Sequence, residues 1–210
     1  MNASKEPTQD PRRVREPLTP EEVGKFEGYA SEIFHRLGLE QGPGTETTPQ
    51  RWLKAMVDMT SGYDGDEKIR TVFPNECPGC PPDHLAHIVE GPIHLMSSCE
   101  HHIVPIIGEA YVAAHSLIGI SKFVRLVRVY ARRFTSQERI TQQVAGDLMK
   151  LINPQGTAVL IKAHHLCSIA RGVREVTSAT TTMAFRGVYL TDLHRRDEFT
   201  QLVAHRMGNY

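Results

Sequence analysis

The order of helical and strand-like apolar patterns restricts the fold of this chain more than any other feature of its sequence. Apolar residues first recur with the helical period in two stretches, and the clearest set lies on one face: Val23, Phe26, Ala30, Ile33, Phe34 and Leu37. Later patterns predict two strands, two helices and two further strands, at 86–97, 109–116, 121–133, 135–152, 156–166 and 178–190. A short helix completes the chain, so the sequence predicts an α+β fold with an antiparallel sheet.

Local signals set the boundaries of these regions. Thr19 is placed to cap the first helix, with Pro20 at the first helical position and Glu22 closing a capping box. The preceding residues offer almost nothing apolar to bury, so a disordered arm is expected there. We divide the chain into that arm, a helical region, a loop and a main domain, at 1–18, 19–63, 64–85 and 86–210.

Composition excludes several classes of partner. The 210 residues carry 24 Lys and Arg against 24 Asp and Glu, a balance that predicts no general attraction to nucleic acid or to an anionic membrane. No apolar run approaches the roughly 18 residues of a membrane span, and the polar N-terminus lacks the apolar core of a signal peptide. We therefore expect a cytoplasmic protein. In that reducing compartment, four cysteines favour metal binding or catalysis over disulfides.

Two clusters of cysteine and histidine stand at the ends of predicted strands, CEHH at 99–102 and HHLC at 164–167. Together they could supply three metal ligands and leave a fourth position open: Cys99, His102 and Cys167. Such a set is typical of a catalytic zinc that activates a water. His101 and His165 would remain as imidazoles suited to proton transfer. Either cluster alone could equally be packing or surface groups, but their joint presence favours a metal.

The second cluster leaves an alternative open. Along a strand, positions two apart project from the same face, which puts His165 beside Cys167 and His164 on the opposite face. His165 could instead be a ligand in place of Cys167, or His164 could take the proton-transfer role.

A basic cluster begins the first helix of the main domain. Ser121 can cap this helix, and Lys122 and Arg125 lie one turn apart at its start, where the backbone N–H groups also favour an anion. Arg171 adds positive charge just after the second Cys/His cluster. These cations beside a metal predict a phosphorylated small molecule as the substrate of a hydrolysis.

Other polar residues of these helices have a structural interpretation. Arg132 and Arg133, further along the basic helix, are expected on a solvated face. Glu138 is placed to form a capping box with Thr135 at the start of the next helix.

The CPGC loop contains Cys77 and Cys80, which are spaced to share a metal or to form a redox pair. No second pair of cysteine or histidine residues is free for them, so we favour a reduced, exposed loop. A redox pair or a site shared between subunits is the alternative.

Several motifs together resemble the GTP cyclohydrolase I family. They are SSCEHHIVPIIGEAYVA, IGISKFVRLVRVYARR, QERIT, AHHLCSIARGVRE and TSATTT, and the similarity runs from about residue 19 to the C-terminus. The resemblance implies the tunnelling fold, in which a ββααββ domain contributes its antiparallel sheet to a barrel shared by several subunits. It also implies a homodecamer of two stacked pentamers, with active sites at the subunit interfaces.

The resemblance also implies roles for particular residues. The zinc ligands would be Cys99, His102 and Cys167. A water on this metal would attack C8 of GTP, while His101 and His165 transfer protons as the ring opens and formate leaves. Rearrangement and ring closure would give 7,8-dihydroneopterin triphosphate. The substrate contacts would be Ser121 near the ribose, Gln137 and Glu138 at the guanine edge, and Lys122, Arg125 and Arg171 at the triphosphate.

Two segments depart from the pattern of the family. The turn after His115 is shorter than the usual hairpin, and the loop at 73–92 is atypical. Both could reshape the pocket rim or the assembly, which leaves open a related guanine-nucleotide cyclohydrolase of a deazapurine or modified-purine pathway. A non-catalytic nucleotide-binding regulator is a third hypothesis, which the intact His101 and His165 disfavour.

Overall fold

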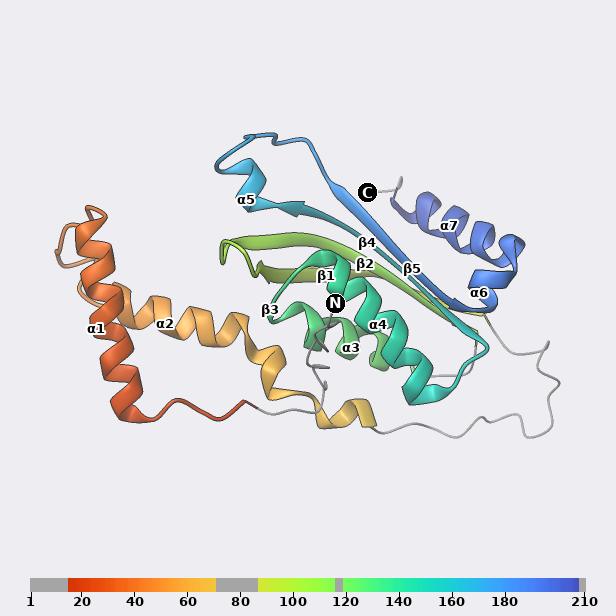
Figure 1. Cartoon of the computed structure of the whole chain (residues 1–210), viewed down its shortest axis with the longest axis horizontal. Helices are drawn as coiled ribbons and strands as arrows, with labels where there is room; N and C mark the ends of the chain where they lie inside the picture. The colour runs from red at the N-terminus through yellow and green to blue at the C-terminus, as the bar shows by residue number, and fades with distance from the viewer. Residues whose placement is uncertain (1–14, 71–86, 116–118, 208–210) are drawn as a thin grey trace, which may run out of the picture.

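The computed structural model describes residues 15–70, 87–115 and 119–207. Most of the predicted arm, the CPGC pair and the shortened turn after His115 lie outside the described residues. Two helices, α1 (Pro20–Arg36) and α2 (Thr48–Met59), project from one end of an α+β body (Figure 1). Two short 3-10 turns follow α2, namely η1 (Ser61–Asp64) and η2 (Glu67–Arg70).

The body is built on a five-stranded sheet in the order β3-β1-β2-β4-β5. Its strands are β1 (His87–Cys99), β2 (Pro105–His115), β3 (Phe134–Thr135), β4 (Gly156–His165) and β5 (Thr180–Gly187). Its helices are α3 (Ser121–Ala131), α4 (Gln137–Ile152), α5 (Leu166–Ile169), α6 (Val188–Thr191) and α7 (Leu193–Met207). The four long strands pair antiparallel, as the sequence predicts.

The sequence does not predict β3. This two-residue strand pairs parallel to the end of β1, with Phe134 opposite Ser98 and Thr135 opposite Cys99. Together with the single turn of α5, it interrupts the expected ββααββ order. Two residues carry no alternating pattern, so apolar periodicity cannot reveal such a strand.

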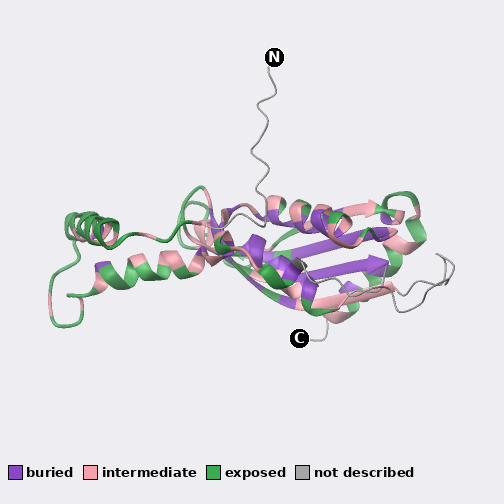
Figure 2. Cartoon of the chain, turned by 90° about the horizontal axis from the view of Figure 1, so that it is seen from below, coloured by how far each residue is buried: buried purple, intermediate pink, exposed green. Residues whose placement is uncertain are grey.

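The two faces of the sheet carry separate apolar cores. On one face, α3 and α4 pack over inward side chains of the long strands, which include Val112 of β2 and Ile161 of β4. On the other face, α6 and α7 cover the alternate positions, which include Tyr111 and Leu160. Buried residues therefore concentrate in the sheet and on the helix surfaces that face it (Figure 2).

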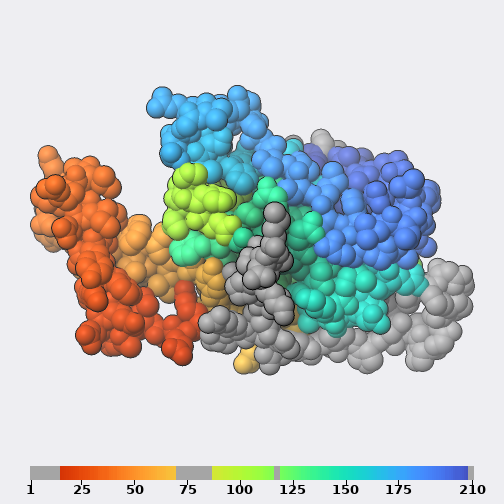
Figure 3. Space-filling view, in the orientation of Figure 1, coloured from red at the N-terminus to blue at the C-terminus, as the bar shows by residue number. Residues whose placement is uncertain are grey.

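The projecting helices carry apolar side chains that no described residue covers. Of the apolar stripe on α1, only Ala30 is buried, whereas Ile33 is 54% and Leu37 is 81% exposed. Phe34 packs edge-to-face on Trp52 of α2, with ring centroids 5.6 Å apart, which holds the two helices together. In Figure 3, α1 lies apart from the body, and α2 connects it to the body. Within the described ranges, no helix is both long and apolar enough to cross a membrane.

The predicted N-cap is right at α1, but at α4 it is one residue too early. The capping box of α1 is confirmed, since Oγ1 of Thr19 accepts from the Glu22 N–H at 3.3 Å and the Glu22 carboxylate accepts from the Thr19 N–H at 2.8 Å. At α4 the cap is Ser136, so the capping box predicted for Thr135 and Glu138 is wrong. Thr135 is instead paired with β1, which moves the start of the helix by one residue.

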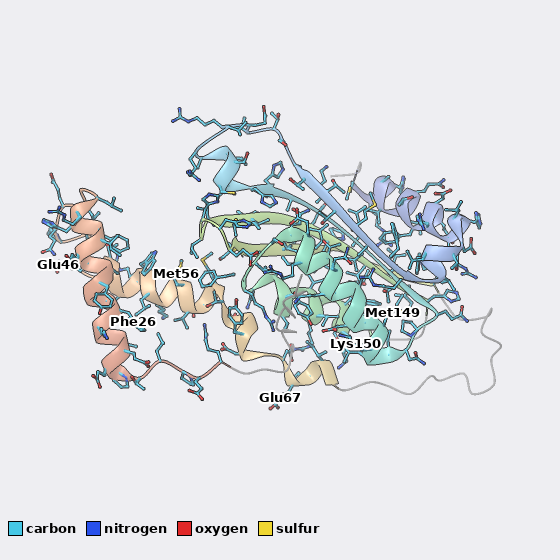
Figure 4. All side chains as sticks on the ribbon, in the orientation of Figure 1. Phe26, Glu46, Met56, Glu67, Met149 and Lys150 are labelled. Atoms are coloured by element: carbon cyan, nitrogen blue, oxygen red, sulfur yellow. The ribbon has the colours of Figure 1, made fainter. Side chains whose placement is uncertain are left out.

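The start of α3 differs from the prediction, whereas the end of α4 has a common capping geometry. α3 begins at Ser121 itself, with Ile120 at the cap position, so the predicted capping role of the exposed Ser121 is wrong. α4 ends at Ile152. Its C-cap, Asn153, has a left-handed backbone (φ 44°) and donates its N–H to the Met149 carbonyl at 3.1 Å. Met149 and Lys150 mark this last turn in Figure 4.

The half-buried His87 and the buried His115 lie at the end of the sheet that carries α6 and α7. His87 opens β1 and His115 ends β2, and the two are partners in the strand register with ring centroids 6.5 Å apart. Glu198 lies 3.6 Å from Nδ1 of His87, and Arg195 donates to Nε2 of His115 at 3.0 Å. Burial lowers the pKa of both histidines, Arg195 lowers both further, and Glu198 opposes the change.

This histidine pair predicts a loss of stability in mild acid. Unfolded histidine titrates near pH ~6.5 and the folded pair titrates lower, so below that pH the unfolded chain binds more protons than the folded one. The Tm should therefore fall between about pH 7.5 and pH 5.5, and it should fall less in the double variant His87→Gln/His115→Gln. Thermal unfolding at fixed protein concentration measures the difference.

The matched control is His94→Gln, an exposed position of the same strand. This variant should keep the wild-type difference in Tm between the two pH values. A double variant with that same difference would contradict the assignment to His87 and His115.

Candidate active site

The CEHH motif forms the turn between β1 and β2. The Cys99 N–H donates to the Val104 carbonyl at 3.0 Å, and the Ile103 N–H donates to the Cys99 carbonyl at 2.8 Å, which closes a tight loop. Ile103 has a left-handed backbone (φ 55°), a conformation that costs roughly 1–2 kcal/mol for a residue with a Cβ. The turn leaves His101 and His102 exposed beside the buried Cys99.

This turn is fixed to the start of α4. The Glu100 N–H donates to the Thr135 carbonyl at 3.1 Å, and the Glu100 carboxylate forms an ion pair with Arg139. Both charged groups are half-buried, which limits their screening by water. The turn therefore keeps a constant place relative to Gln137 and Glu138 in the first turn of α4.

Cys167 reaches this turn by a route that the sequence does not predict. β4 ends at His165 and Cys167 lies in α5, so the expectation that both residues share one strand face is wrong. His164 is exposed, with Nδ1 3.0 Å from the Ser178 carbonyl oxygen. His165 is half-buried and points to the other side of the strand, where its Nε2 lies 2.9 Å from Oε1 of Gln137.

The turn and α5 bring the three candidate metal ligands together. The Sγ atoms of Cys99 and Cys167 and a ring nitrogen of His102 lie within 4.8 Å of one another. Two thiolates and an imidazole are donors that zinc prefers, and three protein ligands leave a position for a water. Nδ1 of His101 lies 3.6 Å from Sγ of Cys99, next to this group but not part of it.

The ionisation of Cys167 also fits a metal at this place. Burial raises the pKa of the Cys167 thiol, and the neighbouring Cys99 raises it further. Without a cation the thiol is therefore favoured over the thiolate. A divalent metal would reverse this balance, because it binds the thiolate and releases the proton.

We expect Cys167→Ser to lose bound zinc, because a serine hydroxyl is a much weaker zinc donor than a thiolate. The zinc content per chain of the purified variant should fall well below that of the wild-type protein. Ser168→Ala, a change of the next residue in α5, is the matched control and should keep its metal. Full zinc occupancy in the Cys167→Ser protein would remove Cys167 from the ligand set.

Gln137 lies between α4 and the sheet, next to His165. Its side chain is fully buried, with 0% of the residue exposed. Its Nε2 donates to the carbonyls of Ile161 and Thr180, each at 3.0 Å, and lies 3.1 Å from Oγ1 of Thr182. The amide is therefore anchored to both β4 and β5.

The candidate phosphate-binding cations lie in two places. Lys122 and Arg125 stand at the start of α3, against the segment that leads into η2. Nζ of Lys122 donates to the Lys68 carbonyl, and Arg125 pairs with Asp66 at 2.8 Å. Arg171 is exposed in the loop after α5. The structure thus places two of these cations together and the third on a separate loop.

The basic residues at the end of α3 do not share one environment. Arg132 is exposed, as predicted, but Arg133 is only 2% exposed, so a solvated position is wrong for it. The Arg133 guanidinium donates twice to the Gly62 carbonyl, at 3.2 and 2.9 Å, and lies over the rings of Tyr63 and Tyr130. Arg133 therefore ties η1 to the body.

Sequence reasoning missed two residues that fix the site, Arg139 and Asp66. Arg139 pairs with Glu100 across 39 residues, and Asp66 pairs with Arg125 across 59 residues. No periodicity or short motif links positions so far apart. The one available signal was the place of Arg139 directly after Glu138 in the QER motif.

The fold and the Cys-His-Cys group at its edge define a candidate metal-dependent enzyme of the α+β class. The chain matches the family model of GTP cyclohydrolase I over residues 26–204. It is 42% identical to a protein of Nostoc sp. named GTP cyclohydrolase 1 2, over 80% of this chain and 79% of that protein. It is 36% identical to the GTP cyclohydrolase 1 of Campylobacter curvus, over 85% of this chain and 94% of that protein. With the GTP cyclohydrolase 1 of Neurospora crassa it shares 34% identity, over 87% of this chain and 58% of the fungal protein.

The chain therefore belongs to the GTP cyclohydrolase I family, as the motifs in its sequence predict.

Proposed function

We propose that the chain hydrolyses GTP at C8, releases formate and closes the product ring to 7,8-dihydroneopterin triphosphate, with zinc in the active site. The observation that carries this proposal is the group formed by Cys99, His102 and Cys167, whose ligand atoms lie within 4.8 Å of one another. Family membership supports the reaction, because the matched region, residues 26–204, contains all three residues.

The three residues would hold zinc through two sulfur atoms and one ring nitrogen. When bound, zinc would act as a Lewis acid and lower the pKa of a water in the open position to about 7. Cys99 is buried whereas His102 is exposed, so the group is accessible from one side. A substrate can therefore approach without displacing a protein ligand.

His101 and His165 are proposed to transfer protons while the imidazole ring of guanine opens. The attacking water must lose a proton, and the nitrogen released from C8 must gain one. Imidazole can do both near neutral pH. His101 stands 3.6 Å from Sγ of Cys99, and His165 ends the strand that leads into α5.

The guanine and ribose are proposed to contact the first residues of α3 and α4. The Glu138 carboxylate is exposed in the first turn of α4 and could accept two N–H groups of guanine, whereas adenine has no N–H at N1. Gln137 is assigned to the same edge of the base. The whole residue is 0% exposed in the described structure, so its side chain is not free for that contact there. Ser121, exposed at the start of α3, is assigned to the ribose.

The proposed assembly is a homodecamer of two pentamers, with active sites at the subunit interfaces and a cytoplasmic location. Two features support association. β5 is an edge strand of the sheet, and an edge can pair with another chain. The exposed apolar side chains of α1 offer a second surface to bury.

Incubation of the zinc-loaded protein with GTP tests the reaction. Formate and a product with the mass of 7,8-dihydroneopterin triphosphate are expected. In His165→Ala, zinc content and GTP binding should persist while turnover falls by about 10²–10⁴-fold, the contribution typical of a general acid–base group. Formate with a ring-opened product would favour a related cyclohydrolase instead. The absence of both formate and a pterin product would exclude the enzymatic proposal.

The matched control is His164→Ala, because His164 is exposed on the opposite side of β4. It should retain turnover. Normal turnover in His165→Ala would contradict the proton-transfer role, and lost zinc would place His165 among the ligands.

Arg171 provides a test of triphosphate binding. Its side chain is exposed, so Arg171→Ala should cost little stability. GTP binding should weaken by roughly 10–150-fold, because a charge-assisted hydrogen bond contributes about 1.5–3 kcal/mol. Guanosine binding, measured in the same titration calorimetry series, should hardly change. Arg132→Ala, an exposed arginine at the end of α3, is the control, and equal losses for GTP and guanosine would refute the assignment.

A further inference from the structure

The side-chain amide of Gln137 has a fixed orientation. Its nitrogen lies 3.0 Å from each of two backbone carbonyl oxygens, those of Ile161 in β4 and Thr180 in β5. A carbonyl oxygen only accepts hydrogen bonds, so the NH2 end of the amide must face this pair. The amide oxygen therefore faces Nε2 of His165, at 2.9 Å. The reverse orientation would bring the amide oxygen against two other oxygens.

This orientation determines which nitrogen of His165 carries the proton. An amide oxygen has no hydrogen to donate, so the bond requires a proton on Nε2 of His165. A neutral imidazole has a single N–H, and its lone pair then sits on Nδ1. Nδ1 is therefore the nitrogen of His165 that can accept a hydrogen bond.

Gln137 is itself held in place from several sides. Oγ1 of Thr182 lies 3.1 Å from Nε2 of Gln137 and 2.7 Å from Oγ1 of Thr141, and Thr141 donates to the Gln137 backbone carbonyl at 2.8 Å. The residue has 0% exposure, so its polar atoms face protein groups and not bulk water. Rotation of the amide toward a ligand would break its hydrogen bonds to Ile161, Thr180 and Thr182 at once.

We propose that Gln137 is a positioning residue: its amide oxygen holds the His165 ring in one orientation and in the Nε2–H tautomer. The proposal rests on the proton-transfer role proposed for His165. It assigns the side chain of Gln137 to the protein and not to guanine.

Gln137→Met tests the proposal, because methionine has similar length and volume but offers no oxygen to His165. The kcat should fall by about 10–100-fold, the scale of loss seen when the hydrogen-bond partner of a metal-binding histidine is removed. KM for GTP and zinc content should stay at their wild-type values. A raised KM with unchanged kcat would assign the side chain to guanine and overturn the proposal.

Thr182→Val is the matched control for packing. It removes one partner of Gln137 Nε2 and leaves the two backbone carbonyls that fix the amide, as well as the contact with His165. It should lower Tm about as much as Gln137→Met and leave kcat close to that of the wild type. Equal losses of kcat in the two variants would show a packing effect and overturn the positioning role.

A double variant separates this proposal from the proposed function. If Gln137 acts through His165, then Gln137→Met/His165→Ala should be no slower than His165→Ala alone. Normal turnover in His165→Ala would defeat the role of His165 itself. A slow His165→Ala protein beside a fully active Gln137→Met protein would defeat only the positioning role.

Nitrogen-15 NMR of the full chain, zinc-loaded and labelled on histidine, reads the tautomer without reference to activity. The His165 signals, identified by their loss in His165→Ala, should show a protonated Nε2 and a bare Nδ1. In Gln137→Met the two tautomers should mix. A proton on Nδ1 in the wild-type protein would overturn the proposal, even if the methionine variant failed to fold.

Discussion

The geometry of the candidate site depends on the pairing between the end of β1 and β3. This short parallel contact places Thr135 beside Cys99, and the Glu100 N–H extends it by donating to the Thr135 carbonyl at 3.1 Å. Because α4 follows β3 directly, the same contact sets the positions of Gln137 and Glu138 relative to the CEHH turn. The turn that carries two proposed metal ligands, Cys99 and His102, thus belongs to one hydrogen-bonded unit with the residues proposed to contact the base, although nearly 40 positions separate them in sequence.

The antiparallel register of β2 and β4 fixes the other half of the site. His165 lies opposite Ile106, one residue into β2 after the CEHH turn. A Cβ on Gly108 would lie 2.1 Å from the Lys162 carbonyl oxygen, so the close approach of the two strands at this point requires glycine. If the register slipped by one residue, His164 and His165 would exchange faces, and the contact with α4 would be lost. The sheet therefore decides which of the two adjacent histidines can serve the site.

Much of this arrangement could be predicted from the sequence, because it is encoded locally. The four long strands and the main helices carry clear apolar periodicity, and the cysteines and histidines are chemically distinctive at strand ends. The rest depends on contacts between distant segments. Arg133 has the sequence context of an exposed arginine, and it is buried only because Gly62 offers a carbonyl and two tyrosine rings surround it. The cap at Ser136 instead of Thr135 likewise follows from β3, a pairing with β1 that no local pattern encodes.

Under the proposed function, the charges for the triphosphate are ordered before any nucleotide binds. Arg125 pairs with Asp66 at 2.8 Å, and Lys122, only 7% exposed, donates to the Lys68 carbonyl. These contacts restrict two long side chains, whose ordering would otherwise oppose binding. Asp66 contacts Arg125 through one nitrogen, and a guanidinium has further N–H groups that can serve a phosphate. The same carboxylate also weakens the attraction of Arg125 for a polyanion, so the segment around η2 both orients and attenuates the positive charge. That segment then belongs to the substrate site and is more than a connection between the projecting helices and β1.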